Sequence, residues 1–355
     1  MIRVAIVGIG NCASTLIQGK YYYHQHKNMV GIKNAQIGKY SIDDIEFVCA
    51  FDVDRRKVGK DLSEAIFQAP NSSTIFCQVP FLGVTVLKGH VYDGIAPHMS
   101  DTFLNCDEQS SVNVADELQK KQVDILINYL PVGSKKATEF YASECLKAKV
   151  AFINAIPEFI CSDRNWEKKF IAAKIPCAGD DIKSQVGATI INRVLTELVY
   201  GRGCIIENMY QLNIGGNTDF MNMLEESRLK SKRISKTQSV LSVIKEGEKM
   251  PEVKIGPSEH IPHLGDSKIC YINIKGRQFA GVPFEIDLKL KVEDSPNSAG
   301  VMLDVIRLLQ IAKDNNISGN IPAINAFAFK SPSLQFSDGQ SDNLVNDFIT
   351  KYSLL

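Results

Sequence analysis

Five cationic side chains lie close together where residues 227 to 237 read SRLKSKRISKT. Such a run is most often a solvated surface, but its ammonium and guanidinium groups also suit a phosphate. Ser235 and Gln238 form a capping-box pattern before an apolar run, which predicts a helix that starts here and ends near Gly247. Lys236 would then oppose the helix dipole in the first turn unless an anion lay over the helix start. The segment therefore predicts a site for a phosphate monoester.

A glycine-rich turn near the N-terminus is typical of a nucleotide site. Residues 8 to 13 read GIGNCA, which fits the pattern G-x-G-x-x-G/A between an apolar strand and a helical run. The glycines allow close approach of a pyrophosphate, whose charge the amides of the following helix would meet. Asp52 closes the second apolar strand, where an acid grips a ribose hydroxyl and favours NAD over NADP. The predicted cofactor contacts are Gly8, Gly10, Asn11, Cys12, Ala13 and Asp52.

Three further polar clusters are difficult to explain as packing. They read GDDIKSQ from residue 179, GGNTD from residue 215 and EDSPNS from residue 293. The first follows a short apolar strand, and open α/β sheets bind ligands at the carboxyl ends of their strands. The same cluster also suits a helix N-terminus with Asp180 or Asp181 as its cap, so both interpretations stay open.

The elements that would position these residues follow from an alternation of apolar and amphipathic segments. Buried strands are expected at 2–8, 45–52, 123–131, 151–157 and 176–181, and helices at 54–66, 134–148, 165–174 and 185–200. This order predicts an α/β fold, with a Rossmann-type doubly wound parallel sheet in an NAD-binding domain over residues 1–200.

The pattern of predicted strands and helices changes after residue 200. Longer strand candidates at 205–216, 268–276 and 283–294 predict a second α+β domain over residues 201–296. The helical run 297–315 is expected to return the chain to the Rossmann domain, so that residues 297–355 form a C-terminal segment of it. The second domain is thus predicted to be inserted before that segment.

Composition argues against several classes of partner. Lys and Arg total 40, as do Asp and Glu, so the chain lacks the net charge that recruits nucleic acid or an anionic membrane. Neither a signal-peptide pattern nor an apolar run long enough for a bilayer is found. The nine cysteines are odd in number and form no C-x-x-C pair, which is typical of reduced thiols. A cytoplasmic protein without nucleic-acid or membrane partners is therefore expected.

Several segments, taken together, resemble the short prokaryotic type of myo-inositol-phosphate synthase over essentially the whole chain. They are VAIVGIGNCAS, AFDVDRRKVG, INYLPVGS, GDDIKSQVGAT, the stretch from LNIGGNTDF through SKRISKT, and VEDSPNSAG. The resemblance implies an NAD-dependent isomerase that converts glucose 6-phosphate into 1D-myo-inositol 3-phosphate. The implied route is oxidation at carbon 5, enolisation, intramolecular aldol closure and re-reduction, with no net oxidation. A homotetramer assembled through the sheet of the second domain is also implied, so that residues 201–296 would serve catalysis and oligomerisation.

The same resemblance implies which residues do the chemistry. Lys232 would relay the proton at carbon 5, while three other lysines would share the phosphate and the developing oxyanions; these are Lys236, Lys268 and Lys330. The other implied catalytic residues are Asp181, Asp219, Asp294 and Asn217. The implied cofactor site adds Asp61, Asn128, Pro131, Tyr141, Asn154 and Ser184, and shares Asp181, Asp219 and Lys232 with the catalytic set.

Some alternatives stay open at this stage. No metal ligands are predicted, since His260 and His263 beside a proline suit surface residues better, but a divalent cation bound through substrate phosphate and a carboxylate is also compatible. A two-domain NAD-dependent dehydrogenase of the semialdehyde or amino-acid type would produce net NADH. A non-enzymatic NAD sensor would not need the lysines. A Schiff-base aldol reaction competes with the enolate route, because lysine is its usual nucleophile.

Overall fold

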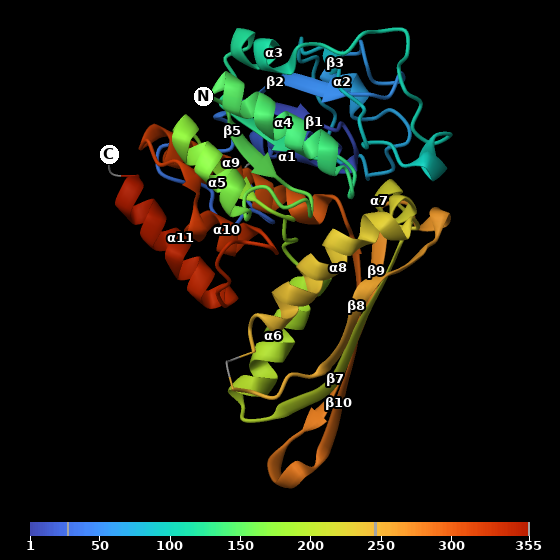
Figure 1. Cartoon of the computed structure of the whole chain (residues 1–355), viewed down its shortest axis with the longest axis vertical. Helices are drawn as coiled ribbons and strands as arrows, with labels where there is room; N and C mark the ends of the chain where they lie inside the picture. The colour runs from blue at the N-terminus through green and yellow to red at the C-terminus, as the bar shows by residue number, and fades with distance from the viewer. Residues whose placement is uncertain (27, 245–246, 354–355) are drawn as a thin grey trace.

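The computed structural model describes residues 1 to 355 except 27, 245–246 and 354–355, and it has two parts, each built on one sheet (Figure 1). The larger sheet has seven strands in the order β11-β6-β5-β4-β1-β2-β3, and all neighbours are parallel. Its strands are β1 (Ile2–Val7), β2 (Ile45–Asp52), β3 (Val86–Lys88), β4 (Ile125–Asn128), β5 (Ala151–Asn154), β6 (Pro176–Gly179) and β11 (Gly319–Asn320).

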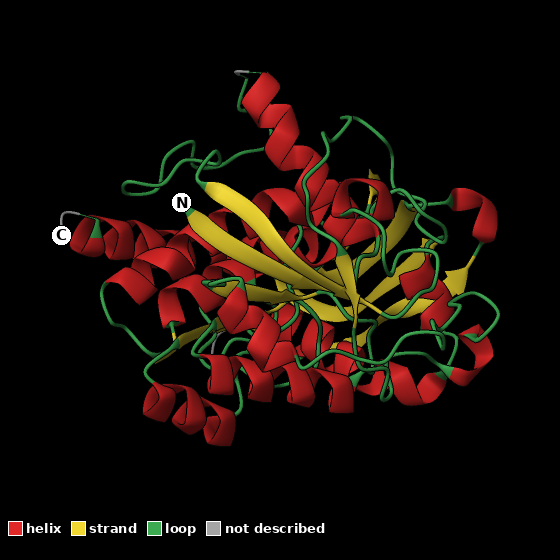
Figure 2. Cartoon of the chain, turned by 90° about the horizontal axis from the view of Figure 1, so that it is seen from above, coloured by secondary structure: helices red, strands yellow, loops and turns green. Residues whose placement is uncertain are grey.

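Helices cover both faces of the parallel sheet (Figure 2). One face packs against α1 (Asn11–Gln25), α9 (Pro296–Asp314), α10 (Pro322–Ala328) and α11 (Asp338–Tyr352) through a core in which β1 contributes Val4 and Ile6. The other face packs against α3 (Val114–Lys120), α4 (Lys135–Ala148) and α5 (Arg164–Ala173) through Ala5, Val7 and Phe152. Strands buried on both faces are what the continuous apolar runs predict.

The second sheet is smaller and mixed, with the order β10-β9-β7-β8. Its strands are β7 (Ile205–Gly215), β8 (Glu252–His260), β9 (Ser267–Arg277) and β10 (Pro283–Glu293); β7 and β8 are parallel and the other pairs antiparallel. Helices α6 (Ala188–Gly201) and α8 (Glu226–Leu241) cover one face of it, and the short α7 (Thr218–Asn222) follows β7 (Figure 1). Strand β8 was not predicted.

The predicted fold class is confirmed: a doubly wound parallel sheet carries a second sheet domain, and α9 leads the chain back beside α1 and β1. The domain limits at residues 200 and 296 stay a prediction, and α6 packs on the second sheet although it precedes residue 200. Within the described residues, no helix combines the length and the apolar character that crossing a bilayer requires.

Two of the predicted helices are wrong. Residues 55 to 59 form turns between isolated β-bridges at Asp54 and Asp61, and only α2 (Leu62–Ala65) of the predicted helix 54–66 exists. The Asp54 carboxylate accepts hydrogen bonds from the backbone and side chain of Arg56, and such local bonds compete with helix formation. Helix α8 starts at Glu226 rather than at Ser235 and ends at Leu241 rather than near Gly247, so Lys236 lies well inside it.

Candidate active site

A cavity lies at the carboxyl edge of the parallel sheet and extends to the ends of β7, β9 and β10. Gly8 and Gly10 of the glycine turn line one part of it. All four implied lysines line the same cavity, although they come from three distant stretches of the chain: Lys232, Lys236, Lys268 and Lys330. The predicted nucleotide site and the predicted lysine site therefore share one cavity.

The glycine turn has the geometry that a dinucleotide requires. Gly8 has a φ of +87°, and a Cβ there would lie 2.6 Å from the Tyr129 carbonyl oxygen. A Cβ on Gly10 would meet no atom within 4 Å, so the space beside it is open toward the cavity. Within the described chain, no side chain caps the start of α1 and its first turn holds no acidic residue. The turn thus leaves helix amides and space for a pyrophosphate.

The peptide of Ile9 inside this turn is held on both sides. Its N–H donates to the Asp52 carboxylate at 2.7 Å, and its carbonyl accepts from Lys57 Nζ at 2.7 Å and from Asn71 Nδ2 at 3.1 Å. Lys57 is buried, and burial lowers the pKa of its ammonium group. Asp52 lines the cavity where a ribose would lie, so the turn, the acid and the adjoining space fit NAD.

Three of the four lysines are paired with carboxylates. Lys232 Nζ lies 2.5 Å from Asp219 Oδ2, Lys268 Nζ lies 3.0 Å from Asp294 Oδ1, and Lys330 Nζ lies 2.8 Å from Asp181 Oδ1. Burial would raise the pKa of Asp181 and of Asp294, but neighbouring ammonium groups hold both pKa values below the ordinary one. Burial opposes the charge on Lys268, yet the Asp294 carboxylate raises the pKa of Lys268 above its usual value.

Lys236 differs from the other three lysines. It is buried, and among the residues that the structure describes none forms a hydrogen bond or ion pair with its Nζ. Burial lowers the pKa of Lys236 well below its ordinary value, and the neighbouring ammonium groups of Lys268, Lys232 and Lys330 lower it further. Desolvation and like charge both favour the neutral amine, which is the form that accepts a proton.

The basic residues of the segment lie on different faces of α8. Lys232 and Lys236 are four residues apart, so both face the cavity. Arg228, on the same face, donates to the carbonyl oxygens of Val132 and Asp93 instead. Arg233 pairs with Glu226 at 3.2 Å, and Lys230 is exposed. The helix start predicted at Ser235 is therefore not an anion site, and Lys232 and Lys236 are the cations of the segment that line the cavity.

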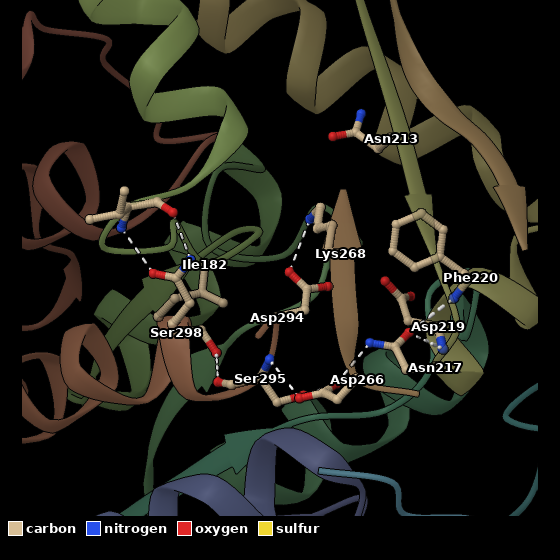
Figure 3. A network of polar contacts seen from close by, with 12 residues as sticks. Ile182, Asn213, Asn217, Asp219, Phe220, Asp266, Lys268, Asp294, Ser295 and Ser298 are labelled. Carbon is tan, nitrogen blue, oxygen red and sulfur yellow. Dashed lines mark hydrogen bonds and ion pairs between the residues drawn. The ribbon is translucent and has the colours of Figure 1, made fainter. Parts of the chain in front are cut away.

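A polar network supports the cavity wall opposite the parallel sheet (Figure 3). Asp266 Oδ1 accepts from Asn217 Nδ2 at 3.0 Å, from Ser295 Oγ at 2.8 Å and from Asn11 Nδ2 at 3.3 Å. Asn217 also caps α7, because its Oδ1 accepts from the amides of the next turn, including that of Asp219 at 3.1 Å. Burial raises the pKa of Asp266 to about 6. The network ties the glycine-turn helix to the lysine-bearing domain.

The cavity brings most of the implied residues together. Besides the lysines it is lined by Asp181, Asp219, Asp294, Asn217, Gly8, Gly10, Asn11, Cys12, Asp52, Pro131, Tyr141 and Ser184. Four implied cofactor residues do not line it: Ala13, Asp61, Asn128 and Asn154. Asp61 caps α2, while Asn128 and Asn154 bond to each other at 2.9 Å below the strand ends. Neither Asp180 nor Asp181 caps α6, which begins after Gly187.

The structure adds residues that the sequence did not identify. Lys57 is buried and lines the cavity, and the buried Asp266 supports the cavity wall through its hydrogen bonds with Asn217 and Ser295. From the predicted EDSPNS cluster, Ser295 and Ser298 line the cavity as well. Asp266 lies two residues before Lys268 in the sequence, but its burial could not be predicted from the sequence. Within the described residues, no three His, Cys, Asp or Glu side chains are grouped so that they could hold a metal ion.

Comparisons with known proteins agree with one another. The family model of myo-inositol-1-phosphate synthase matches residues 187–295. The chain is 47% identical over 351 residues to the inositol-3-phosphate synthase of Mycobacterium tuberculosis. The matched region covers 98% of this chain and 95% of that protein. Its identity to the inositol-3-phosphate synthase of Corynebacterium glutamicum is 45%, with 98% of each chain covered.

Solved structures show the same architecture. The myo-inositol-1-phosphate synthase-related protein of Thermotoga maritima is 25% identical, with a TM-score of 0.81 over 99% of this chain and 98% of that one. The inositol-3-phosphate synthase of Caenorhabditis elegans is 16% identical, with a TM-score of 0.81 over 99% of this chain and 86% of that one. At that identity the second likeness speaks for the fold alone.

Proposed function

This chain belongs to the myo-inositol-phosphate synthase family, and from that premise we propose how its side chains cyclise glucose 6-phosphate. The product is 1D-myo-inositol 3-phosphate, and the reaction is redox-neutral. A two-domain dehydrogenase is not favoured, since relatives that are 47% identical over 98% of the chain are synthases by name. The observation that carries the proposed division of labour is that three of the four cavity lysines have a carboxylate partner, while Lys236 has none among the described residues.

NAD is the proposed cofactor, with its pyrophosphate over Gly8 and Gly10 and its ribose at Asp52. When bound, it supplies a hydride acceptor for carbon 5 and later returns the hydride. The open space beside Gly10 and the uncapped start of α1 support this placement. The residues below the strand ends, Asn128 and Asn154, would support the cofactor site from underneath rather than touch the ligand.

Lys232 and Asp219 would move the proton of the hydroxyl at carbon 5. Lys232 Nζ and Asp219 Oδ2 are 2.5 Å apart, so Lys232 can accept the hydroxyl proton while it passes one of its own to Asp219. The reverse transfer restores the hydroxyl when carbon 5 is reduced again. No net proton is consumed by this pair, which agrees with a redox-neutral isomerisation.

The three remaining lysines would divide the carbon–carbon bond formation. Lys236, as a neutral amine, would take the proton from carbon 6 next to the new ketone. Lys268, held charged by Asp294, would bind the substrate phosphate. Lys330 would give a proton to the oxyanion that forms at carbon 1 as the ring closes.

The proposal is tested by following both the product and the nicotinamide. Wild-type protein with NAD⁺ and glucose 6-phosphate is expected to yield inositol phosphate, measured as phosphate released after periodate treatment, without lasting NADH absorbance. Lasting NADH without inositol phosphate would instead indicate a dehydrogenase. Borohydride added during turnover is expected to trap no lysine adduct, whereas a stable adduct at Lys236 would replace the enolate route with a Schiff base.

A homotetramer assembled through the open face of the second sheet is also proposed, in a cytoplasmic enzyme. On that face Tyr210 and Tyr271 are 40% and 39% exposed, beside the partly exposed Leu212, Ile214 and Ile269. Charged side chains of β10 flank this apolar stripe, including Asp287 and Lys289. An apolar stripe with a charged rim is typical of a subunit interface.

Tyr271→Glu is expected to break the tetramer into smaller species, because it places a charge in the centre of the stripe. Light scattering coupled to size-exclusion chromatography measures the change in mass. Tyr271→Phe keeps the apolar ring and serves as the matched control, which should remain tetrameric. A Tyr271→Glu protein with unchanged mass would place the interface elsewhere.

A further inference from the structure

A chain of hydrogen bonds leads away from the active-site carboxylate Asp181. Its Oδ1 accepts from Lys330 Nζ at 2.8 Å, and its Oδ2 accepts from the hydroxyl of Ser235 at 2.7 Å. The Ser235 oxygen in turn accepts from the hydroxyl of Ser331 at 2.8 Å. Both hydroxyl groups therefore donate toward Asp181, so all the hydrogen bonds from Ser331 to Asp181 run in the same direction.

The two ends of this chain reach different surfaces. Asp181 and Lys330 line the active-site cavity. Ser331 instead lines a separate open groove beside the outer face of α8, which is formed with Phe159, Gln238 and Gln335. Ser235 between them is completely buried, at 0% exposure, so the hydroxyls provide a path through the wall that separates cavity and groove.

The backbone holds both ends in place. The amide of Lys330 donates to the carbonyl of Asp181 at 2.8 Å, and the amide of Ser331 donates to the carbonyl of Asp180 at 3.1 Å. The segment with Lys330 and Ser331 is thus bonded directly to the segment with Asp180 and Asp181. Helix α8 supplies Ser235, which bridges Ser331 and Asp181. The Ser235 hydroxyl donates to Asp181 and accepts from Ser331, which is the arrangement that passing a proton requires.

The proposed chemistry creates a need for such a path. Lys236 gains the carbon 6 proton while Lys330 gives one to the oxyanion at carbon 1, so no net proton is consumed. The two lysines nevertheless end a turnover with one proton too many on Lys236 and one too few on Lys330. Lys236 can lose its proton once product leaves the cavity, but Lys330 has to be reprotonated from solvent.

We propose that Ser331 and Ser235 form a proton relay that recharges Lys330 through Asp181 with protons from the groove, and this rests on the acid role proposed above for Lys330. A hydronium ion or buffer acid in the groove protonates the Ser331 oxygen as Ser331 passes its proton to Ser235. Ser235 passes its own proton to Oδ2 of Asp181, and a half-turn of the carboxyl group presents this proton to the Lys330 amine beside Oδ1. Each group regains its starting proton count except Lys330, which gains one. Both serines act through Asp181 and are positioning residues rather than catalytic ones.

The relay is tested with Ser235→Ala in the full-length protein loaded with NAD⁺. Loss of the hydroxyl should lower kcat about tenfold, because reprotonation of Lys330 becomes slow. The specific readout is buffer dependence: kcat of Ser235→Ala should rise with the concentration of a small acid such as imidazolium at constant pH and ionic strength. Wild-type kcat should not respond.

Ser239→Ala is the matched control. Ser239 lies one turn further along α8 and is equally buried, and its hydroxyl has no hydrogen-bond partner within the described chain. The same atom is removed in both variants, but only Ser235→Ala interrupts the path. Ser239→Ala should therefore keep kcat within about twofold and show no buffer response.

Ser331→Ala breaks the path at the groove end, away from the cavity, and should reproduce the buffer dependence even if Ser235→Ala folds poorly. A slow Ser235→Ala or Ser331→Ala enzyme whose kcat ignores buffer concentration would overturn the relay, as would full activity in both variants. Lys330→Met separates the two proposals: if it remains active, the acid role of Lys330 fails, whereas an inactive Lys330→Met with unaffected serine variants rejects the relay alone.

Discussion

Lys236→Met is expected to lower kcat for cyclisation by roughly a thousandfold, because it removes the proposed base for the carbon 6 proton. Methionine preserves the length and apolar stem of the side chain, so α8 should keep its packing. The pKa of Lys236 lies well below its ordinary value, and the neutral form is the active one. In wild type, kcat/KM should therefore rise with pH through that lowered pKa, and the variant should lose this rise.

Lys230→Met is the control for this experiment, since Lys230 lies on the same helix but is exposed. It makes the same replacement on the same helix, yet should leave kcat within about twofold. If Lys236 bound the substrate phosphate instead of acting as the base, Lys236→Met would have a different effect. A large increase in KM with kcat preserved would reassign Lys236 from base to phosphate ligand.

The parallel sheet could be predicted because its signal is local. Continuous apolar runs such as residues 2–8 mark strands buried on both faces, and the glycine turn directly follows the first of them. The helix predicted at 54–66 failed because local hydrogen bonds of Asp54 outweighed the amphipathic pattern. The capping box at Ser235 failed for a tertiary reason, since that hydroxyl bonds to Asp181 instead of a helix amide.

The lysine site could not be derived from spacing. Lys232 and Lys236 share a helix face, but Lys268 and Lys330 come from β9 and from the chain after α10, and only the family resemblance placed them in one set. What distinguishes Lys236 is the absence of a carboxylate partner among the described residues and its burial among like charges. Both properties depend on three-dimensional distances, which a sequence without relatives does not contain.

Gly8→Ala and Gly10→Ala are expected to fail in different ways, although the two glycines belong to one motif. At Gly8 the φ of +87° and the Tyr129 carbonyl 2.6 Å from a Cβ both oppose a side chain, so Gly8→Ala should lose about 3 kcal/mol of unfolding free energy. At Gly10 a Cβ meets no protein atom within 4 Å, and an alanine at the start of α1 should cost at most about 1 kcal/mol.

Gly10→Ala should instead lose NAD⁺ affinity, because its methyl group occupies the space proposed for the pyrophosphate. We expect Kd to rise roughly a hundredfold, equivalent to about 2.7 kcal/mol, with little change in the melting temperature of the unliganded protein. Calorimetric titration with NAD⁺ and thermal unfolding without it measure the two quantities separately. Gly19→Ala, inside α1 where a Cβ also meets no atom within 4 Å, is the control that should keep the NAD⁺ affinity and not lower the melting temperature, because alanine is the better helix former. Undiminished NAD⁺ affinity in Gly10→Ala would mean that the cofactor does not lie over this turn, and the placement of carbon 5 beside Lys232 would fail with it.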